Sequence, residues 1–316
     1  MLEEALYTKI HRLNQKVWEG RVNRLNIQMW LDNFDGTVKP IDAERKHMLF
    51  LLSNFMYFGS LQIRELLKAV FRDLYKYPIV HAIRKDNRDT RNLALIDGLF
   101  SGELSKSRFL GVGNPSESGC HLLYHFRQMN ALPKEIFIHA HEIFRPKRFT
   151  GRWVLANKAI RRYVFIDDFC GSGDQVVGYC KQIIQQAKKQ DPRVKFFYYS
   201  LFGCKKGVEN VARRKLFDDV QCLVELDETF GCFHGMSRYF HAAPTEIDKG
   251  IAERICRKYG SRMMPGNPLG YGDCQLLLSF HHNTPDNTLP VFWWDEVSPD
   301  WTPIFKRYPK LSYTSI

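Results

Sequence analysis

Short apolar runs alternate with helical patterns from about residue 105 to residue 226, and this alternation limits the fold more than any other feature. The runs with strand character cover residues 109–113, 136–143, 163–167, 194–201 and 222–226. Residues 121–129, 175–187 and 208–217 have helical spacing. The pattern predicts an α/β fold, mainly a parallel sheet with helices on both faces. Ligands of such sheets bind at the carboxyl ends of the strands.

The chain before this stretch predicts helices. Ile63, Leu67 and Val70 recur at three- and four-residue spacing and line one helix face, and Ser60 is the expected N-cap. We therefore expect a helical N-terminal region over residues 1–104 and an α/β domain with a C-terminal extension over residues 105–316. Paired amphipathic helices usually pack against the rest of a protein, and a helix-turn-helix use in nucleic-acid binding is the alternative.

Net charge and cysteine content give limited information on the partners of the protein and on its cellular compartment. The net charge of +12 suits a polyanionic or phosphorylated partner, but an ordinary basic protein has such a charge too. No two of the eight cysteines have CxxC spacing, so we expect buried thiols in a reducing compartment rather than a zinc site. We see no signal-peptide core and no apolar window of about 18 residues, which predicts a cytoplasmic protein without a membrane span.

The most informative segment begins with the strand candidate 163–167. This strand ends in two adjacent carboxylates, Asp167 and Asp168, and a loop of small residues then leads into a helix. Glycines allow close approach of backbone to a ligand, and the N–H groups of such a loop and helix start attract an anion. The carboxylates would repel a phosphate but can accept hydrogen bonds from sugar hydroxyls. The segment therefore favours a sugar-phosphate site, and a tight turn with acids facing solvent is the alternative.

The same segment resembles the 5-phosphoribosyl-1-pyrophosphate (PRPP) signature of the type I phosphoribosyltransferases, which has an apolar strand, two acids, two variable residues and a glycine-containing loop. The resemblance implies that Asp167 and Asp168 hold the ribose 2- and 3-hydroxyls. It implies a cradle for the 5-phosphate, made by Cys170, Gly171, Ser172, Gly173, Asp174 and Gln175. The family usually has Thr where this chain has Gln175.

Two further segments follow the order of that fold, and the resemblance implies that they bind pyrophosphate. The expected strand 109–113 runs into a loop and helix start, where the implied ligands are Ser116, Glu117, Ser118 and Gly119. Cations crowd the span between residues 143 and 163, where the family has a mobile basic loop, and Arg148 and Arg152 are the implied ligands there. The alternatives are a capped helix start without a ligand and a solvated run of charge.

Histidines and tryptophans give weaker indications. His282 and Asn283 follow the apolar run 275–280 and are candidates for contact with a base or nucleotide, with a structural loop as the alternative. His139 and His141 share one face of an expected strand, a weak metal-like pattern for which we prefer a structural role. Three tryptophans lie near the end of the chain: Trp293, Trp294 and Trp301. They can stack on bases, but packing is more common.

Nearly the whole chain resembles the phosphoribosyltransferase-like proteins of bacterial conflict systems, which occur beside antiphage modules, including some retrons. The helical N-terminal half and the tail motif of residues 268–290 carry this resemblance. It implies an effector that binds PRPP or a phosphoribosyl nucleotide and makes or breaks the bond at the ribose anomeric carbon. Such an enzyme is a phosphoribosyltransferase or a nucleotide glycosidic-bond hydrolase. The implied cofactor is Mg²⁺, held mostly by ligand oxygens, and we expect no metal site built by protein side chains.

A binding module with the same fold is the rival hypothesis. It would sense a nucleotide without turnover and dock a nucleoprotein, such as a retron reverse transcriptase with its DNA. The sequence also leaves a homo-oligomer open.

Overall fold

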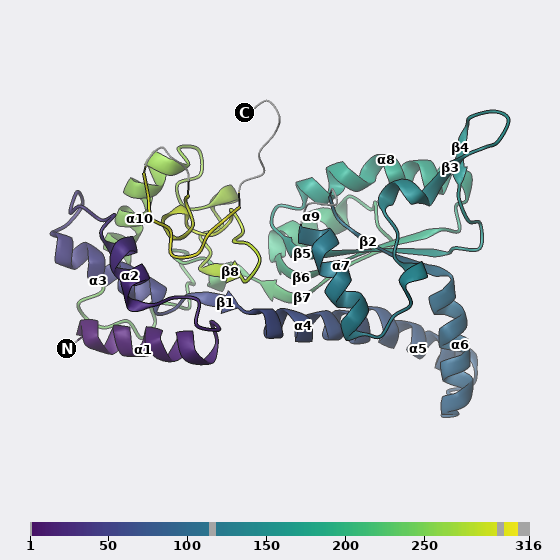
Figure 1. The fold of residues 1–316 in the computed structure, drawn as a ribbon, viewed down its shortest axis with the longest axis horizontal. Helices are drawn as coiled ribbons and strands as arrows, with labels where there is room; N and C mark the ends of the chain where they lie inside the picture. Colours follow the sequence, from purple (N-terminus) through teal and green to yellow (C-terminus); the bar gives the residue numbers. More distant parts are fainter. Residues whose placement is uncertain (1, 114–117, 296–299, 309–316) are drawn as a thin grey trace. The chain divides into compact units, whose positions relative to one another are not determined.

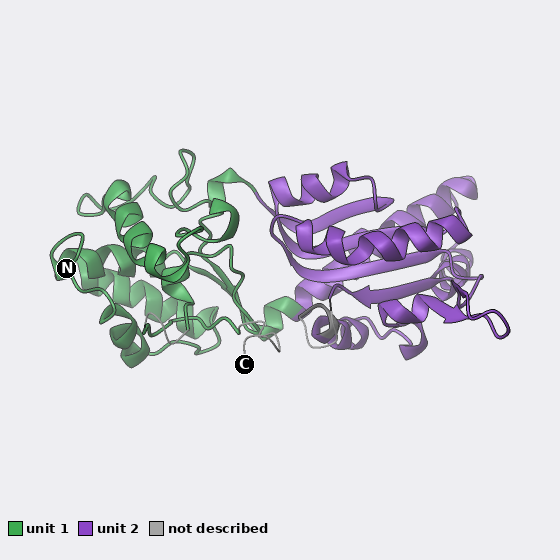
Figure 2. Ribbon diagram, turned by 90° about the horizontal axis from the view of Figure 1, so that it is seen from above, with its two compact units in different colours: residues 1–63, 227–316 green, residues 64–226 purple. Residues whose placement is uncertain are grey.

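The computed structural model describes residues 2–113, 118–295 and 300–308. The chain divides into two compact units, which Figure 2 draws in separate colours: unit 1 comprises residues 1–63 and 227–316, and unit 2 comprises residues 64–226. The boundary expected after residue 104 falls inside unit 2, near the end of helix α6 (Leu93–Ser105). The two divisions differ because helices before residue 105 pack on the central sheet, whereas residues after 226 pack with the first helices of the chain.

Unit 2 contains a sheet of four parallel strands in the order β2-β5-β6-β7 (Figure 1). Its strands are β2 (Ser107–Gly111), β5 (Arg162–Cys170), β6 (Lys195–Cys204) and β7 (Asp219–Leu226). The helices between them are α7 (Ser118–Met129), α8 (Asp174–Gln190) and α9 (Lys205–Arg213). The predicted α/β class with a parallel sheet is confirmed, and four of the five predicted strands are present.

Helices cover both faces of this sheet, as its apolar strands require. On one face, Phe165, Phe196 and Tyr198 pack with buried residues of α8 and α9. On the other face, the ring of Phe109 lies 4.9 Å from that of Tyr75 and 5.3 Å from that of Phe126 in α7. Helices thus pack on both faces of the sheet, and the carboxyl ends of its four parallel strands lie at the same edge.

The helices that precede β2 belong to this core. They are α4 (Ser60–Ala69), the wider π-type turn η1 (Val70–Lys76), α5 (Tyr77–Asp86) and α6. Pro78, the second residue of α5, has no N–H to donate to the preceding turn, and η1 ends two residues before it. The hydroxyl of Tyr75 in η1 donates to Ser107 Oγ of β2 at 2.7 Å in a buried contact.

The prediction of a strand over residues 136–143 is wrong. Its residues form two short 3₁₀ turns, η2 (Lys134–Ile136) and η3 (Ala140–Ile143), with a single bridge between Phe137 and Phe109 of β2. The carboxylate of Glu142 accepts a hydrogen bond from the His139 N–H at 2.7 Å and closes the second turn. This local bond competes with extended backbone, so the apolar run lies beside β2 without adding a strand.

An antiparallel hairpin follows and consists of β3 (Phe144–Pro146), a turn and β4 (Trp153–Leu155). Its base is fixed to the last residue of α8, Gln190. The Leu155 N–H donates to Gln190 Oε1 at 2.8 Å, and Gln190 Nε2 donates to the Trp153 carbonyl at 3.1 Å. The hairpin thus lies at the C-terminal end of α8, as Figure 1 shows.

Unit 1 combines segments from both ends of the chain. Its longer elements are α1 (Leu2–Lys16), α2 (Arg24–Leu31), α3 (Ile41–Leu52), β1 (Met56–Phe58), α10 (Lys249–Met263) and β8 (Leu278–Phe280). Three 3₁₀ turns complete it: η4 (Glu228–Phe230), η5 (Tyr271–Asp273) and η6 (Pro290–Phe292). The strands β1 and β8 are parallel neighbours although more than two hundred residues separate them.

Aromatic packing joins these segments. Trp30 of α2 stacks on Phe292 with a centroid distance of 5.2 Å, and its Nε1 donates to the Val291 carbonyl at 2.7 Å. Trp293, Trp294 and Trp301 are buried in the same core, so the structure gives these rings a packing role. In the part of the chain that the structure describes, no helix has both the length and the apolar character needed to cross a bilayer.

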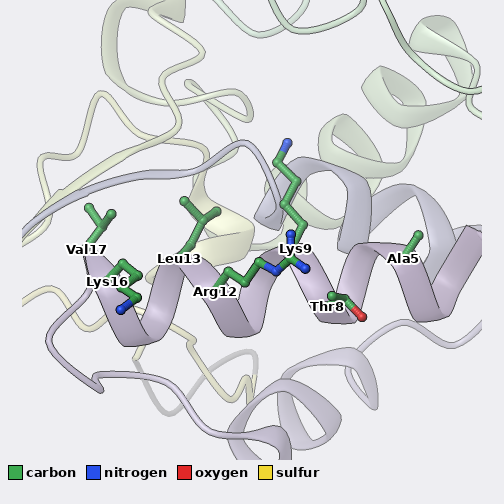
Figure 3. A pocket seen from close by; sticks show the side chains of 7 residues that line it. All are labelled: Ala5, Thr8, Lys9, Arg12, Leu13, Lys16 and Val17. Carbon is green, nitrogen blue, oxygen red and sulfur yellow. The ribbon is translucent and has the colours of Figure 1, made fainter.

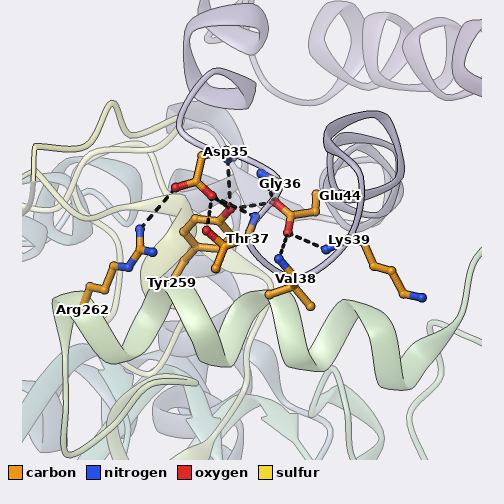
Figure 4. Close-up of polar contacts among 8 residues, drawn as sticks. All are labelled: Asp35, Gly36, Thr37, Val38, Lys39, Glu44, Tyr259 and Arg262. Atoms are coloured by element: carbon orange, nitrogen blue, oxygen red, sulfur yellow. Dashed lines mark hydrogen bonds and ion pairs between the residues drawn. The ribbon is translucent and has the colours of Figure 1, made fainter.

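A buried carboxylate orders the loop between α2 and α3 (Figure 4). Glu44 is inaccessible to solvent and accepts hydrogen bonds from the N–H groups of Gly36, Val38 and Lys39 at 2.6–3.1 Å. The Tyr259 hydroxyl of α10 lies 2.7 Å from the carboxylates of both Glu44 and Asp35. This network ties the two sequence segments of unit 1 together without leaving the buried charge unsatisfied.

Candidate active site

The two adjacent acids lie near the carboxyl end of β5, as predicted. In the register of β5 against β6, Asp167 is paired with Ser200 and Phe169 with Phe202. Asp168 lies between these two pairs. The Tyr198 hydroxyl donates to Asp167 Oδ2 at 2.9 Å, and the Asp168 N–H donates to Asp167 Oδ1 at 3.1 Å. Tyr198 thus holds Asp167 from within the sheet. Asp168, about 9% exposed, is the more buried of the two acids, because Asp167 is half-buried.

Burial sets the electrostatics of this acid pair. Desolvation, and then the charge of Asp168, raise the pKa of Asp167 well above its ordinary value. Desolvation also raises the pKa of Tyr198 well above normal, and it raises the pKa of the neighbouring Cys170 thiol to about 12. Tyr198 therefore keeps its proton and stays a donor to Asp167, and Cys170 is not a thiolate nucleophile at neutral pH.

The small-residue loop fits between β5 and α8 because α9 has a glycine of its own. Gly173, directly before α8, has a φ of +82°, which favours glycine. A Cβ on Gly173 would lie 2.9 Å from the Gly207 carbonyl oxygen, and a Cβ on Gly207 would overlap the Gly171 carbonyl oxygen. The loop is therefore pressed against α9, and its glycines have a packing role in addition to any role in ligand binding.

Polar contacts hold the same loop in place. Ser172 Oγ accepts a hydrogen bond from the Asp174 N–H at 3.2 Å, and the Ser172 carbonyl accepts one from the Asn210 side chain at 2.9 Å. Asp174 and Gln175 are exposed at the start of α8. The N-terminus of a helix attracts anions. At the start of α8, however, the carboxylate of Asp174 repels a bound phosphate.

The structure brings only part of the implied pyrophosphate site to this edge of the sheet. Ser116 and Glu117 lie outside the described residues. Ser118 and Gly119 begin α7, which follows the carboxyl end of β2 and hence the same edge as Gly171. Arg148 and Arg152 lie in the hairpin at the opposite end of α8, and its 17 residues separate the two ends by about 24 Å.

The other candidate residues have structural contacts. His282 and Asn283 belong to unit 1, not to the unit that holds Asp168. Asn283 Oδ1 accepts hydrogen bonds from the backbone N–H groups of Thr284 and Tyr308 at 3.0 Å each, and the His282 ring stacks on Phe280. The exposed rings of His139 and His141 stack on each other at 5.7 Å. Among the described residues, no His, Cys, Asp or Glu cluster could hold a metal ion.

Sequence reasoning missed three residues that shape this site: Tyr198, Gly207 and Asn210. Tyr198 lies in an aromatic run, which indicates a strand but not a functional residue. Gly207 and Asn210 lie in α9, whose sequence has no pattern typical of a phosphate-binding loop. Tyr198 is paired with Phe165, two residues before Asp167, so its contact with Asp167 could be found only with the register of β5 and β6.

Comparison with known proteins gives the chain its family. The family model PRTase-CE matches residues 27–307. Two solved structures with a likeness to this chain are phosphoribosyltransferases. For the xanthine-guanine-hypoxanthine phosphoribosyltransferase of Helicobacter pylori, the identity is 9% and the TM-score 0.30, covering 54% of this chain and 83% of that chain. For the orotate phosphoribosyltransferase of Aeropyrum pernix, the identity is 16% and the TM-score 0.25, covering 44% of this chain and 77% of that chain.

No curated protein matches the chain. The family match spans most of the sequence and includes the acid pair, the small-residue loop and the tail motif. Together with the four-stranded parallel sheet, it supports a type I phosphoribosyltransferase-like fold. The chain belongs to the PRTase-CE family and is a phosphoribosyltransferase-like protein.

Proposed function

We propose that the protein binds PRPP or a phosphoribosyl nucleotide at the carboxyl edge of the β2-β5-β6-β7 sheet and makes or breaks the bond at the ribose anomeric carbon. The observation that carries this proposal is the Gly171–Gly173 loop, which lies between the acid-bearing end of β5 and the start of α8. A sugar phosphate has the two parts this site can serve: an anion for the loop and helix start, and hydroxyls for a carboxylate.

The residues would divide the work as follows. The backbone from Gly171 to Gln175 receives the 5-phosphate, and Asp168 accepts hydrogen bonds from ribose hydroxyls. Asp167 is a positioning residue in this scheme, because its oxygens already accept from Tyr198 and from the Asp168 N–H. Positive charge develops on the ribose ring during the reaction, and a negative carboxylate beside the hydroxyls stabilises that charge. No protein nucleophile is required.

Magnesium fits this arrangement as an ion carried by the substrate. Asp167 and Asp168 lie near the end of β5, beside the loop, and carboxylate oxygens suit an ion that keeps several waters and binds mainly phosphate oxygens. When bound, it would supply charge neutralisation on the diphosphate. The role we propose in the cell is that of a cytoplasmic antiphage effector associated with a retron, and this rests on the family resemblance.

A nucleotide-sensing module without turnover is the second candidate. The exposed Asp174 at the helix start and Gln175 in place of the usual Thr favour it, because both differ from an open, uncharged phosphate cradle. Such a module would report ligand binding to a nucleoprotein partner through its basic surface.

Incubation of the whole protein with PRPP and a panel of nucleotides, with and without Mg²⁺, separates these functions. Repeated release of pyrophosphate or free base that Asp168→Asn abolishes supports the enzyme. Calorimetric binding without release supports the sensing module. If neither PRPP nor any nucleotide binds, and the protein is folded, the site assignment is wrong for both.

A further inference from the structure

The hairpin of residues 144–155 in unit 2 combines exposed cations with exposed aromatic rings. It carries no acid, and neither does the chain on to residue 166. The exposed cations on it and directly after it are Arg145, Lys147, Arg148, Arg152 and Lys158. Two aromatic rings accompany them: Phe149 is 91% exposed and Trp153 is 57% exposed. The segment therefore exposes both cations and aromatic rings to solvent, and the packing of unit 2 does not require either.

The cations of this hairpin have no ion-pair partner among the described residues, whereas the next two arginines do. Arg161 pairs with Asp191 at 3.0 Å, and Arg162 pairs with Glu103. The contact recorded for the cations at the tip is that of the Arg148 guanidinium with the Phe149 ring, at 5.9 Å. The hairpin cations can therefore form charge-assisted hydrogen bonds to an external anion without giving up an ion pair among the described residues.

The strand register arranges these groups on the hairpin. Arg145 is paired with Val154, and the Lys147 N–H donates to the Arg152 carbonyl at 2.8 Å, which continues the ladder. Because side chains alternate along a strand, Arg145, Lys147 and Arg152 fall on one face of the ribbon. Trp153 is paired with Pro146 on the other face, and Phe149 stands in the turn between the strands.

Its position separates the hairpin from the proposed phosphoribosyl site. Both backbone bonds to Gln190 fix its base at the C-terminal end of α8, while the Gly171–Gly173 loop lies at the N-terminal end. The base of the hairpin is thus about 24 Å away along the helix. Figure 1 shows the turn extending away from the sheet.

We infer that this hairpin is a binding arm for single-stranded nucleic acid. Its cations would contact the phosphate backbone, and Phe149 and Trp153 would stack on unpaired bases, which is how proteins combine charge and aromatic rings to hold single strands. A duplex keeps its bases stacked on one another and offers these rings no partner. The inference does not depend on the proposed reaction, because it uses none of the residues at the β5–α8 loop.

Unit 1 has a second cationic surface, which lacks these rings (Figure 3). Lys9, Arg12 and Lys16 line a groove of about 470 Å³ on α1 together with Ala5, Thr8, Leu13 and Val17. Arg12 and Lys16 are exposed. Neutralising them changes the net charge of the protein as much as neutralising two hairpin arginines, so this pair provides a matched control.

The test measures binding of a fluorescein-labelled twelve-residue oligothymidylate by anisotropy, for the whole protein and three variants. The double variant Arg148→Gln, Arg152→Gln should weaken binding at least about tenfold. It should also make the slope of log K against log salt shallower by about 1.4, because each of the two lost phosphate contacts contributes about 0.7 to that slope. Phe149→Ala should weaken it at least about fivefold, as loss of one stacked base does. The control double variant Arg12→Gln, Lys16→Gln should weaken oligothymidylate binding much less.

Trp153 supplies an independent signal from inside the hairpin. The chain has six tryptophans, and the other five are at most 7% exposed. Stacking of a base on Trp153 should therefore quench its emission when oligothymidylate is added, and Trp153→Phe should remove that quenching while circular dichroism stays unchanged. Phe149 is almost fully exposed, so its truncation removes no packing and the variant should fold normally.

Four results would overturn the inference. The control pair on α1 could weaken binding as much as the hairpin pair, which would indicate attraction by net charge alone. A matched duplex could bind as tightly as the single strand, or Phe149→Ala could have no effect, and either would exclude stacking. An oligoglutamate peptide or phosphatidylserine vesicles could bind the hairpin as tightly as oligothymidylate, which would make it a general anion surface. PRPP is absent from all these measurements, so failure of the proposed reaction would not affect them.

Discussion

Replacement of Gly207 by alanine tests whether α9 shapes the proposed phosphate loop. Alanine normally stabilises a helix interior by up to about 1 kcal/mol relative to glycine. Here the added Cβ would overlap the Gly171 carbonyl oxygen, and a backbone atom cannot rotate away as a side chain can. Overpacking of this kind costs about 1–3 kcal/mol. We therefore expect a net destabilisation of about 1–2 kcal/mol, which lowers the melting temperature by about 2–8 °C in a domain of this size.

The matched control is Gly178→Ala in α8, where a Cβ meets no heavy atom within 4 Å. This variant should gain about 0.5–1 kcal/mol from helix propensity alone. The melting temperature of each variant is measured by differential scanning calorimetry, and its affinity for PRPP is measured by titration at 25 °C. Gly207→Ala should lose PRPP affinity because the loop must shift, and Gly178→Ala should keep it. Equal stability of the two variants with equal PRPP affinity would refute the packing of α9 against the loop.

The remaining predictions concern four acids. Asp168→Asn should lower turnover at least about tenfold, because a neutral amide stabilises the developing positive charge on the ribose less well. Asp167→Asn should reduce turnover less but lower the free energy of unfolding by about 1–3 kcal/mol, because an amide opposes one of its two donors. Steady-state kinetics and urea unfolding measure these effects, and equal turnover losses in the two variants would contradict the division of roles. Asp174→Asn should raise PRPP affinity about two- to fivefold by removing a negative charge at the start of α8, and calorimetry that finds unchanged or weaker binding would place the phosphate elsewhere. Hydrogen bonds from Thr37 and Tyr259 lower the pKa of Asp35 to about 2, below its value in the unfolded chain. The stability from Asp35 should therefore be complete above about pH 4 and be lost as the pH falls toward 2. Urea unfolding of wild type and Asp35→Asn over that range should show their stability difference shrink, and a constant difference would argue against the assignment.

The central sheet could be predicted from the sequence because its signal is local. Strands that are buried on both faces must be mostly apolar, and the two central strands β5 and β6 carry that composition, whereas the edge strand β7 is only half-buried and mixes polar with apolar residues. The position of Asp167 and Asp168 near a strand end followed from the same pattern. The run 136–143 begins with three apolar residues and ends with Ile143, but the bond from the His139 N–H to Glu142 closes a turn between them. A hydrophobic pattern does not report such a local hydrogen bond.

Long-range arrangement could not be predicted from periodicity. The role of Tyr198 depends on the register of β5 against β6, and the place of the hairpin depends on two bonds to Gln190, 35 and 37 residues further along the chain. The implied pyrophosphate role of Arg148 and Arg152 came from their place in the order of elements, which does not determine the direction in which a loop extends. The pairing of β1 with β8 likewise leaves no trace in either segment alone.

The interleaved make-up of unit 1 has a consequence for synthesis on the ribosome. Residues 64–226 form a continuous unit and can complete their sheet as soon as β7 has emerged. The first 63 residues must wait for the last ninety, because β1 needs β8 and Trp30 needs Phe292. Until then, the apolar faces of α2 and α3 lack their partners, so the nascent chain exposes these helices longer than any part of the sheet. Unit 1 is therefore the part whose folding would depend most on chaperones.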